Sequence, residues 1–359
     1  MQIYEKFCII TNLHVKIFLP LHIHYINKME KKDLRIIFMG TPEFAVGSLE
    51  RLVENGYNVV AVVTQPDKPV GRHGSVLRAS AVKEYALAHG LPVLQPVKMK
   101  DESFLEELRS YKADLQVVVA FRMLPEVVWA MPRFGTFNVH AALLPQYRGA
   151  APINWAVING ETKTGVTTFF LDHDIDTGRI IEQMEFPIPD DADVEYVYDG
   201  LMRLGAEICQ HTVDLVIDTD GNVPSQPQRD DMELHPAPKI FKETCEIDWD
   251  KPAKRIYDFV RGLSPYPGTW TTMHPTDSAD AATPSVLKIF KTTKTGEACE
   301  GKAPGSLKAV HGHLYAATAD EWLEIVELQA AGKKRMAARD FLNGFKHAEE
   351  YALKNLKQI

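Results

Sequence analysis

Asn138 and His140 stand two positions apart where an apolar run ends, within the segment FNVHAALLPQYRGAAPIN at residues 137–154. Side chains alternate along a strand, so both would project from one face while Val139 points to the other. A neutral imidazole accepts a proton near neutral pH, and an imidazolium or an amide stabilises an oxyanion. The pair therefore suits attack on a carbonyl carbon, although a histidine that caps a strand and bonds to the backbone explains the same spacing.

A run of acidic residues follows in GVTTFFLDHDIDTGRIIEQ, which places Asp172, Asp174 and Asp176 between two apolar strands. A carboxylate near His140 would orient the imidazole and stabilise its protonated form. Asp176 also begins a plausible Asp-Thr-Gly turn, and the spacing of the three acids partly resembles a calcium loop. The calcium interpretation lacks the closing glutamate, because Gln183 stands at the twelfth position.

The elements that must position these residues alternate between short β-rich runs and helical patterns from Leu34 onward. Apolar runs predict buried strands over residues 34–39, 57–64, 92–96 and 114–121, and periodic patterns predict helices over 43–56, 83–88 and 101–111. This alternation predicts an α/β fold, a Rossmann-like, mostly parallel sheet with helices on both faces. Ligands of such sheets bind beyond the carboxyl ends of the strands, and GTFNVH would end there. The turn MGTPEF lacks the G-x-G-x-x-G of a dinucleotide site.

The pattern changes near residue 220, where the sequence becomes rich in Pro, Asp and Gln. A helical stretch, KPAKRIYDFVRGL, and several short β-rich runs follow and predict a smaller C-terminal β-barrel of OB-like type. We therefore expect a catalytic domain over 34–219, a linker over 220–246 and a C-terminal domain over 247–359.

Composition narrows the class of protein. The chain has 359 residues, which suggests two domains or one large one, and 45% hydrophobic with 25% charged residues is typical of a globular protein with a core. A net charge of −8 argues against coating of nucleic acid by bulk charge but permits a local basic patch. The four scattered cysteines form no CxxC pair, so we expect neither a disulfide framework nor a zinc site. This cysteine usage fits a protein of the reducing cytoplasm best.

The first 33 residues are apolar only in patches that polar residues interrupt, which falls short of the roughly 20 apolar residues of a membrane span. We interpret them as an upstream extension or misassigned start, disordered or loosely attached; the alternative is a weak membrane-surface tether.

The motif NVHAALLPQYRGAAPI, followed by LDHDIDTG, resembles the family of formyltransferases that use 10-formyltetrahydrofolate. RIIFMGTPEFAV, TQPDKPVGR, SPYPGTW and LQAAGKKRMAARDFLNG are similar to the members that formylate methionyl-tRNA. The resemblance covers residues 34 to about 345. It implies 10-formyltetrahydrofolate as cosubstrate, no metal, and initiator methionyl-tRNA as partner.

By that resemblance Asn138, His140 and Asp176 form a catalytic trio. The α-amine of the methionyl group would attack the formyl carbon, Asn138 and His140 would stabilise the tetrahedral intermediate, and Asp176 would assist proton transfer. Phe44 would line a pocket for the methionine side chain. The folate-contacting segment would consist of Ala142, Leu143, Leu144 and Pro145.

Two basic segments are expected to contact tRNA. The loop QPDKPVGRHGSVLRAS carries Arg72 at the family's Gly-Arg position, although it has fewer lysines than many relatives. Lys333, Lys334 and Arg335 lie in the second, where residues 301–359 carry nine Lys and Arg against seven Asp and Glu. By charge alone the second segment would more often be an ordinary solvated surface, and a solvated flexible loop is the alternative for the first.

Other acceptors would suit the same trio, namely a phosphoribosyl glycinamide, a nucleotide-linked amino sugar or water. A nucleic-acid-binding protein without activity is a further alternative, which the intact trio disfavours. The second domain and the basic C-terminal segment favour tRNA. We expect a cytoplasmic monomer with no membrane association and no obligate protein partner.

Overall fold

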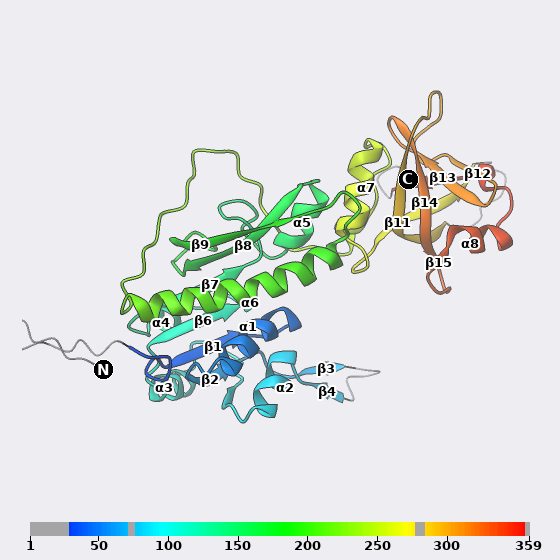
Figure 1. Cartoon of the computed structure of the whole chain (residues 1–359). Coiled ribbons are helices and arrows are strands. Elements are labelled where there is room, and N and C mark those ends of the chain that lie inside the picture. Colours follow the sequence, from blue (N-terminus) through cyan, green and yellow to red (C-terminus); the bar gives the residue numbers. More distant parts are fainter. Residues whose placement is uncertain (1–28, 71–75, 277–283, 356–359) are drawn as a thin grey trace, which may run out of the picture.

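The computed structural model describes residues 29–70, 76–276 and 284–355, which form two bodies joined side by side (Figure 1). The N-terminal body is built on a seven-stranded sheet of order β5-β2-β1-β6-β7-β8-β9. Its first five strands in that order are parallel, β8 pairs antiparallel with β7, and β9 pairs antiparallel with β8. The strands are β1 (Ile36–Gly40), β2 (Val59–Val63), β5 (Val93–Leu94), β6 (Leu115–Val119), β7 (Thr136–His140), β8 (Lys163–Phe170) and β9 (Ile180–Pro187).

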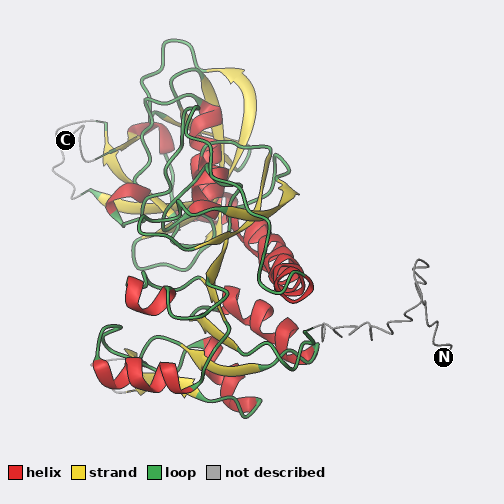
Figure 2. Cartoon of the chain, turned by 90° about the vertical axis from the view of Figure 1, so that its left-hand side faces the viewer, coloured by secondary structure: helices red, strands yellow, loops and turns green. Residues whose placement is uncertain are grey.

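Helices cover both faces of this sheet (Figure 2). Strands β1 and β6 are buried along their whole length, so their alternating side chains feed one apolar core on each face. The first core receives α1 (Glu43–Glu54), α2 (Ala81–Ala88) and α6 (Val194–Asp218). The second receives α3 (Glu102–Ser110) and α4 (Glu126–Trp129).

Helix α6 is the long green helix that runs along the sheet in Figure 1. Its buried residues recur every three or four positions, which gives one apolar stripe against the sheet and α1. Asp193 caps its start, because the Asp193 carboxylate accepts a hydrogen bond of 3.0 Å from the Tyr196 amide.

The C-terminal body is an antiparallel sheet of order β12-β13-β14-β11-β10-β16, with β15 paired to β14. The sheet curls until its two ends meet, because Ser306, directly before β12, forms a bridge with Ala352 in β16. The elements are β10 (Thr269–Pro275), β11 (Ser285–Ala298), β12 (Leu307–Val310), β13 (His313–Ala317), β14 (Glu321–Ala330), β15 (Met336–Ala337), α8 (Ala338–Gly344) and β16 (Tyr351–Lys354). The predicted fold class is thereby confirmed.

Helices α5 (Pro152–Ile158) and α7 (Ala253–Gly262) join the two bodies. They approach closely at Gly262, which has no side chain: a Cβ there would come within 2.6 Å of the Ile158 side chain. Asn154 donates a hydrogen bond of 2.9 Å to the Gly262 carbonyl. The start of α7 is held by Asp320, whose carboxylate accepts 2.8 Å from the Ala253 amide. Burial acts to raise the pKa of Asp320, but hydrogen bonds from this amide and its neighbours bring the pKa below its ordinary value.

The segment predicted as a linker follows α6 and returns along the N-terminal body before it reaches α7 (Figure 1). Gln226 forms a bridge with Ile180 at the start of β9, and Ala237 forms one with Gly149. Backbone pairing at two separate positions, Gln226 and Ala237, therefore fixes this segment to the N-terminal body.

Within the N-terminal extension, residues 1–28 lie outside the described part of the chain. Residues 29–33 contact the N-terminal body: Met29 packs against its core, and Asn58 donates 2.8 Å to the Lys32 carbonyl. Among the described helices, none is long and apolar enough to cross a membrane.

Candidate active site

Strand β7 presents Asn138 and His140 on one face at the carboxyl end of the parallel strands. Phe137 and Val139 point the other way into the core beneath α6, as the alternation predicts. His140 is the last residue of the strand and pairs in register with Thr167 of β8. The pair therefore lies where ligands of such sheets bind.

The His140 ring is buried, and each of its nitrogens has a defined neighbour. Nε2 lies 2.9 Å from the Tyr147 carbonyl oxygen, and Nδ1 lies 3.8 Å from Asp176 Oδ2. Because a carbonyl only accepts hydrogen bonds, Nε2 carries the hydrogen. Nδ1 is then the nitrogen that can take a proton, and it faces a carboxylate.

Asp176 reaches the histidine from the loop between β8 and β9. Its backbone adopts a left-handed conformation with φ 55°, which aspartate tolerates better than most residues. Its Oδ2 accepts a hydrogen bond of 2.9 Å from the Gly149 amide. The end of β7 and the loop after β8 thus bring an imidazole and a carboxylate together.

Asn138 is half-buried, and its side-chain amide forms no hydrogen bond with any described residue. A half-buried amide with unused donors, two residues from the imidazole, suits a developing negative charge on a substrate oxygen. The geometry of the three side chains therefore supports carbonyl chemistry.

The segment Ala142–Pro145 is held in place by a threonine and a glutamine from the two neighbouring strands. The Thr167 hydroxyl donates 2.7 Å to the Ala142 carbonyl and accepts 3.1 Å from the Leu144 amide. Gln183 donates 2.9 Å to the Leu144 carbonyl and 3.0 Å to the Thr167 hydroxyl. The side chains of Ala142 and Leu144 are buried, and those of Leu143 and Pro145 are half-buried.

Sequence reasoning missed Thr167 and Gln183. The signal that points to Thr167 is a hydroxyl at a fully buried strand position, because a buried hydroxyl needs hydrogen-bond partners. It also missed Gln228, which donates 2.8 Å to the Asp176 carbonyl and 2.9 Å to that of Gly178. No local signal indicates this contact, because 52 residues separate Gln228 from Asp176.

The remaining predicted residues are placed as follows. Phe44 is 5% exposed and packs edge-on against Tyr198 at 5.3 Å, so it lies in the core, and a pocket-lining role stays a prediction. Arg72 lies outside the described residues. Lys333 and Lys334 are exposed in the turn between β14 and β15 and form no ion pair with a described residue. Arg335 donates 2.8 Å to the Glu327 carboxylate, so its charge is already paired.

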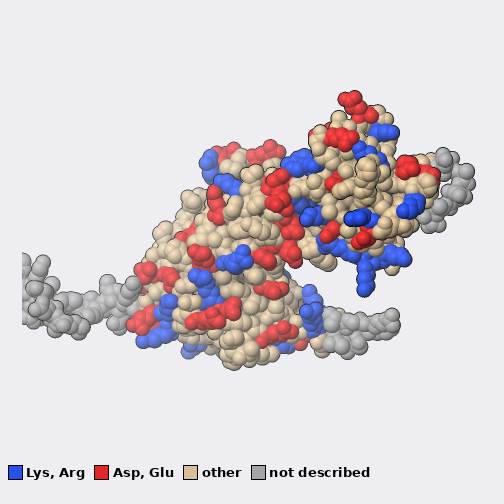
Figure 3. All heavy atoms as spheres, turned by 45° about the vertical axis from the view of Figure 1, so that its right-hand side comes forward, with Lys and Arg blue, Asp and Glu red and all other residues tan. Residues whose placement is uncertain are grey.

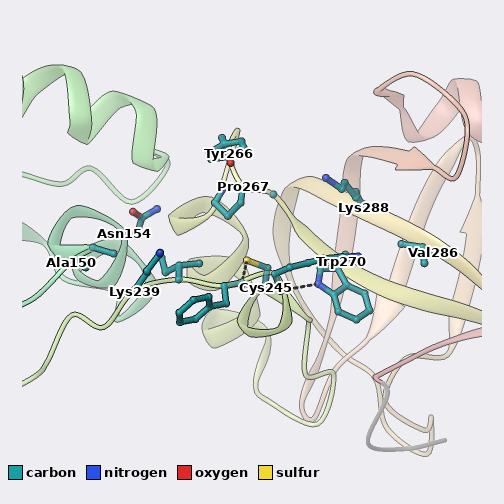
Figure 4. A pocket seen from close by; sticks show the side chains of 14 residues that line it. Ala150, Asn154, Lys239, Cys245, Tyr266, Pro267, Trp270, Val286 and Lys288 are labelled. Carbon is teal, nitrogen blue, oxygen red and sulfur yellow. Dashed lines mark hydrogen bonds between the residues drawn. The ribbon is translucent and has the colours of Figure 1, made fainter. Parts of the chain in front are cut away.

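A cavity of about 620 Å³ opens between the two bodies, and Ala150, the residue after Gly149, is part of its lining (Figure 4). Its lining includes three aromatic residues and three lysines and no carboxylate. Tyr266 and Phe241 are exposed, whereas Trp270 is buried and donates 2.7 Å to the Lys242 carbonyl. Burial raises the pKa of the Cys245 thiol, which also lines the cavity, so this thiol is kept neutral.

Cys209, Cys245 and Cys299 are free thiols, all buried. In the part of the chain that the structure describes, no group of three or more His, Cys, Asp or Glu side chains could hold a metal ion. The carboxylates of Asp172, Asp174 and Asp176 accordingly do not come together as such a group among the described residues.

Comparisons with known proteins match both bodies. Residues 34–213 match a family model described as formyl transferase, and residues 239–346 match one described as formyl transferase, C-terminal domain. A curated relative from Parabacteroides distasonis, named Methionyl-tRNA formyltransferase, is 61% identical and covers 90% of this chain and 100% of its own. A relative of the same name from Bacteroides fragilis is 55% identical and covers 91% of this chain and 99% of its own.

Solved structures share the fold at lower identity. The sugar 3N-formyl transferase WlaRD, crystallised with dTDP and 5-N-formyl-THF, has a TM-score of 0.59 at 18% identity and covers 84% of this chain and 99% of its own. HypX from Aquifex aeolicus, in complex with tetrahydrofolic acid, has a TM-score of 0.55 at 18% identity and covers 86% of this chain and 47% of its own.

Proposed function

The chain belongs to the formyl transferase family, and from that premise we propose that it transfers a formyl group from 10-formyltetrahydrofolate to the α-amino group of methionyl initiator tRNA. The observation that carries the proposal is the approach of His140 Nδ1 to the Asp176 carboxylate at 3.8 Å, beside the Asn138 amide, which has no hydrogen-bond partner among the described residues. The choice of acceptor is supported by relatives at 61% and 55% identity that are named for methionyl-tRNA.

The folate cosubstrate supplies a formyl group bonded to nitrogen, so its carbonyl carbon is the electrophile. The Asn138 amide would stabilise the negative charge that grows on the formyl oxygen, and the His140 ring would do so once it has taken the proton of the attacking amine. The bond from the formyl carbon to the amine forms, and its bond to the folate nitrogen breaks. Segment Ala142–Pro145, fixed by Thr167 and Gln183, would hold the cosubstrate against these groups.

The reaction needs one proton moved, because the attacking amine loses a proton and the departing nitrogen gains one. His140 can accept that proton only at Nδ1, since Nε2 already donates to Tyr147. The Asp176 carboxylate beside Nδ1 would stabilise the imidazolium until the proton reaches the leaving group. An amine leaving group departs once protonated, so the residues in place suffice.

Basic residues support tRNA as the partner. Lys68 in β3 (Lys68–Val70) lies directly opposite Arg78 in β4 (Val76–Arg78), and neither has an ion pair with a described residue. Two like charges facing each other destabilise a hairpin unless an anion compensates them, and a phosphate backbone would do so. The β14–β15 turn with Lys333 and Lys334 lies on the same side as this hairpin (Figure 1), where Lys and Arg side chains gather (Figure 3).

We place the unpaired end of the acceptor strand in the cavity between the two bodies. Exposed Tyr266 and Phe241 offer faces on which bases stack, and Lys239, Lys242 and Lys288 offer positive charge to phosphates. The cavity adjoins the loop that holds His140 and Asp176, so a strand in it would lead the aminoacyl end to the trio. A cytoplasmic location is part of the same proposal.

The test is to mix the purified full chain with 10-formyltetrahydrofolate and either methionyl-tRNA or a dTDP-amino sugar, and to follow the formyl group. We expect transfer to methionyl-tRNA alone. His140→Ala and Asp176→Ala should each lower turnover by at least about 100-fold, the usual scale for general acid–base groups. Formylation of the sugar instead, or of neither acceptor, would overturn the proposal.

A matched control is His211→Ala. His211 also faces a carboxylate, with Nδ1 2.8 Å from Glu182, but it is exposed on α6 away from the end of β7. Its loss should leave turnover unchanged. Near-normal single-turnover rates for His140→Ala or Asp176→Ala would remove that residue from the trio.

A further inference from the structure

We propose that residues 228–237, which we call the strap, are part of the active site, and that Gln228 is the positioning residue that fixes Asp176 against His140. The inference rests on the proposed function, because it assigns a role in that reaction. The strap lies within the segment whose Pro-rich and Gln-rich composition predicts a linker.

Gln228 uses both ends of its amide. Nε2 donates 2.8 Å to the Asp176 carbonyl and 2.9 Å to the Gly178 carbonyl. Oε1 accepts 3.0 Å and 2.6 Å from the Arg148 guanidinium. One side chain therefore joins the two catalytic loops: the Asp176 loop through its donors and the loop after β7 through its acceptor.

The conformation of Asp176 needs such support. With φ 55° the residue is in a left-handed region that costs free energy for residues other than glycine, and it persists only where the surroundings determine it. Gln228 holds its carbonyl and Gly149 holds its carboxylate, so the residue is fixed at both ends. Without the bonds from Gln228, the loop loses the contact that fixes the backbone of Asp176.

The rest of the strap fixes the second loop. The Tyr147 amide donates 2.7 Å to the His235 carbonyl, and the Ala237 amide donates 2.8 Å to the Arg148 carbonyl. Tyr147 supplies the carbonyl that orients His140, so the strap supports both members of the catalytic pair. Gly149 shows how close the strap lies: a Cβ there would come within 2.5 Å of the Ala237 oxygen.

The exposure of the strap residues indicates that hydrogen bonds, more than apolar packing, hold the strap against the catalytic loops. Residues 229–233 are exposed, and Ala237 is the one strap residue that is buried. The strap is thus held by hydrogen bonds to the catalytic loops more than by the apolar core. Removing one of these bonds should change the position of Asp176 with a smaller effect on global stability.

The test compares Gln228→Met with Gln226→Met. The Gln226 side chain is exposed and forms no hydrogen bond with a described residue, so the same change two positions away is a matched control. Misplacement of a catalytic group by about 1 Å costs up to about 100-fold, so we expect Gln228→Met to lower kcat by about 10- to 100-fold. The KM for methionyl-tRNA should stay as in the parent chain, and Gln226→Met should behave as the parent.

Gln228→Glu keeps the acceptor for Arg148 and loses the two donors, so it should lower kcat like Gln228→Met. Gln228→Glu also tests the positioning role of Gln228 if Gln228→Met fails to fold. A double-mutant cycle with Asp176→Asn separates positioning from a general structural role: a residue that acts through Asp176 should have little effect once Asp176 is changed. Additive losses, or equal kcat values for Gln228→Met and Gln226→Met, would overturn the proposal.

Hydrogen exchange at the Gly149 amide gives a readout that does not depend on the acceptor. This amide donates to Asp176, so it should exchange faster in Gln228→Met than in Gln226→Met. If the parent chain transfers no formyl group to methionyl-tRNA, the proposed function fails. If the parent is active and neither exchange nor kcat responds to Gln228, only the role of the strap fails.

Discussion

Thr167→Val tests whether segment Ala142–Pro145 forms the folate site, because it keeps the shape of the side chain and removes one hydroxyl. That hydroxyl uses its full capacity, one donor and two acceptor positions, on Ala142, Leu144 and Gln183. Thr167 is 0% exposed, so water cannot replace the lost partner.

The expected magnitude follows from two backbone groups that lose their partner, the Leu144 amide and the Ala142 carbonyl. Each buried unsatisfied group costs about 1–3 kcal/mol, so the native segment is destabilised by about 2–6 kcal/mol in total. Where the segment shifts to relieve this cost, the loss appears as weaker folate binding, and about 1.4 kcal/mol corresponds to tenfold in affinity. We expect the KM for 10-formyltetrahydrofolate to rise by about tenfold or more, with the KM for tRNA unchanged.

The matched control is Thr168→Val. Thr168 is the next residue of β8 and equally buried, but it faces α6, where its hydroxyl lies 2.9 Å from that of Thr212. It should lower the free energy of unfolding in urea without changing the folate KM. Steady-state formyl transfer with each substrate varied in turn gives both KM values. A folate KM that rises no more in Thr167→Val than in Thr168→Val would refute the assignment of segment Ala142–Pro145.

Three further predictions concern other parts of the molecule. Lys333→Ala with Lys334→Ala should reduce the salt dependence of tRNA binding by about two counterions, measured as the slope of log K against log salt, and an unchanged slope would mean that both lysines face solvent in the complex. Gly149→Ala places a Cβ 2.5 Å from a strap oxygen, so turnover should fall by more than about tenfold; Gly90→Ala, also at positive φ but with nothing within 4 Å, should leave turnover unchanged, and equal turnover in the two variants would contradict this. Asp320→Ala should lower the free energy of unfolding by about 1 kcal/mol at neutral pH through loss of the bond to the start of α7. Because the folded pKa of Asp320 is lowered, its contribution to stability is present above the ordinary value of 3.8 and is lost as the pH falls through the folded pKa. Urea titrations at several pH values would disprove this if the difference in free energy of unfolding between the parent and Asp320→Ala stayed the same at low pH.

Local patterns were sufficient for the elements and for part of the site. Alternation along residues 136–140 predicted that Asn138 and His140 share a face, and the structure has them there, because the side-chain period of a strand does not depend on its neighbours. Apolar runs predicted the central strands, since strands buried on both faces must be apolar throughout. The acidic residues were different. Nothing local distinguishes Asp176 from Asp172 and Asp174, and only the family resemblance selected it.

The sequence by itself determined the α/β and β-rich halves, the edge at which chemistry is possible and the types of residue available there, because these depend on short-range periodicity and composition. Only the tertiary structure decided which carboxylate faces His140, that Thr167 and Gln183 hold the segment at 142–145, and that the chain after α6 returns to hold Asp176 through Gln228. These contacts join residues that lie 16 to 52 positions apart. Their geometry follows from the order of strands in the sheet and from the path of the returning chain, which no local pattern encodes.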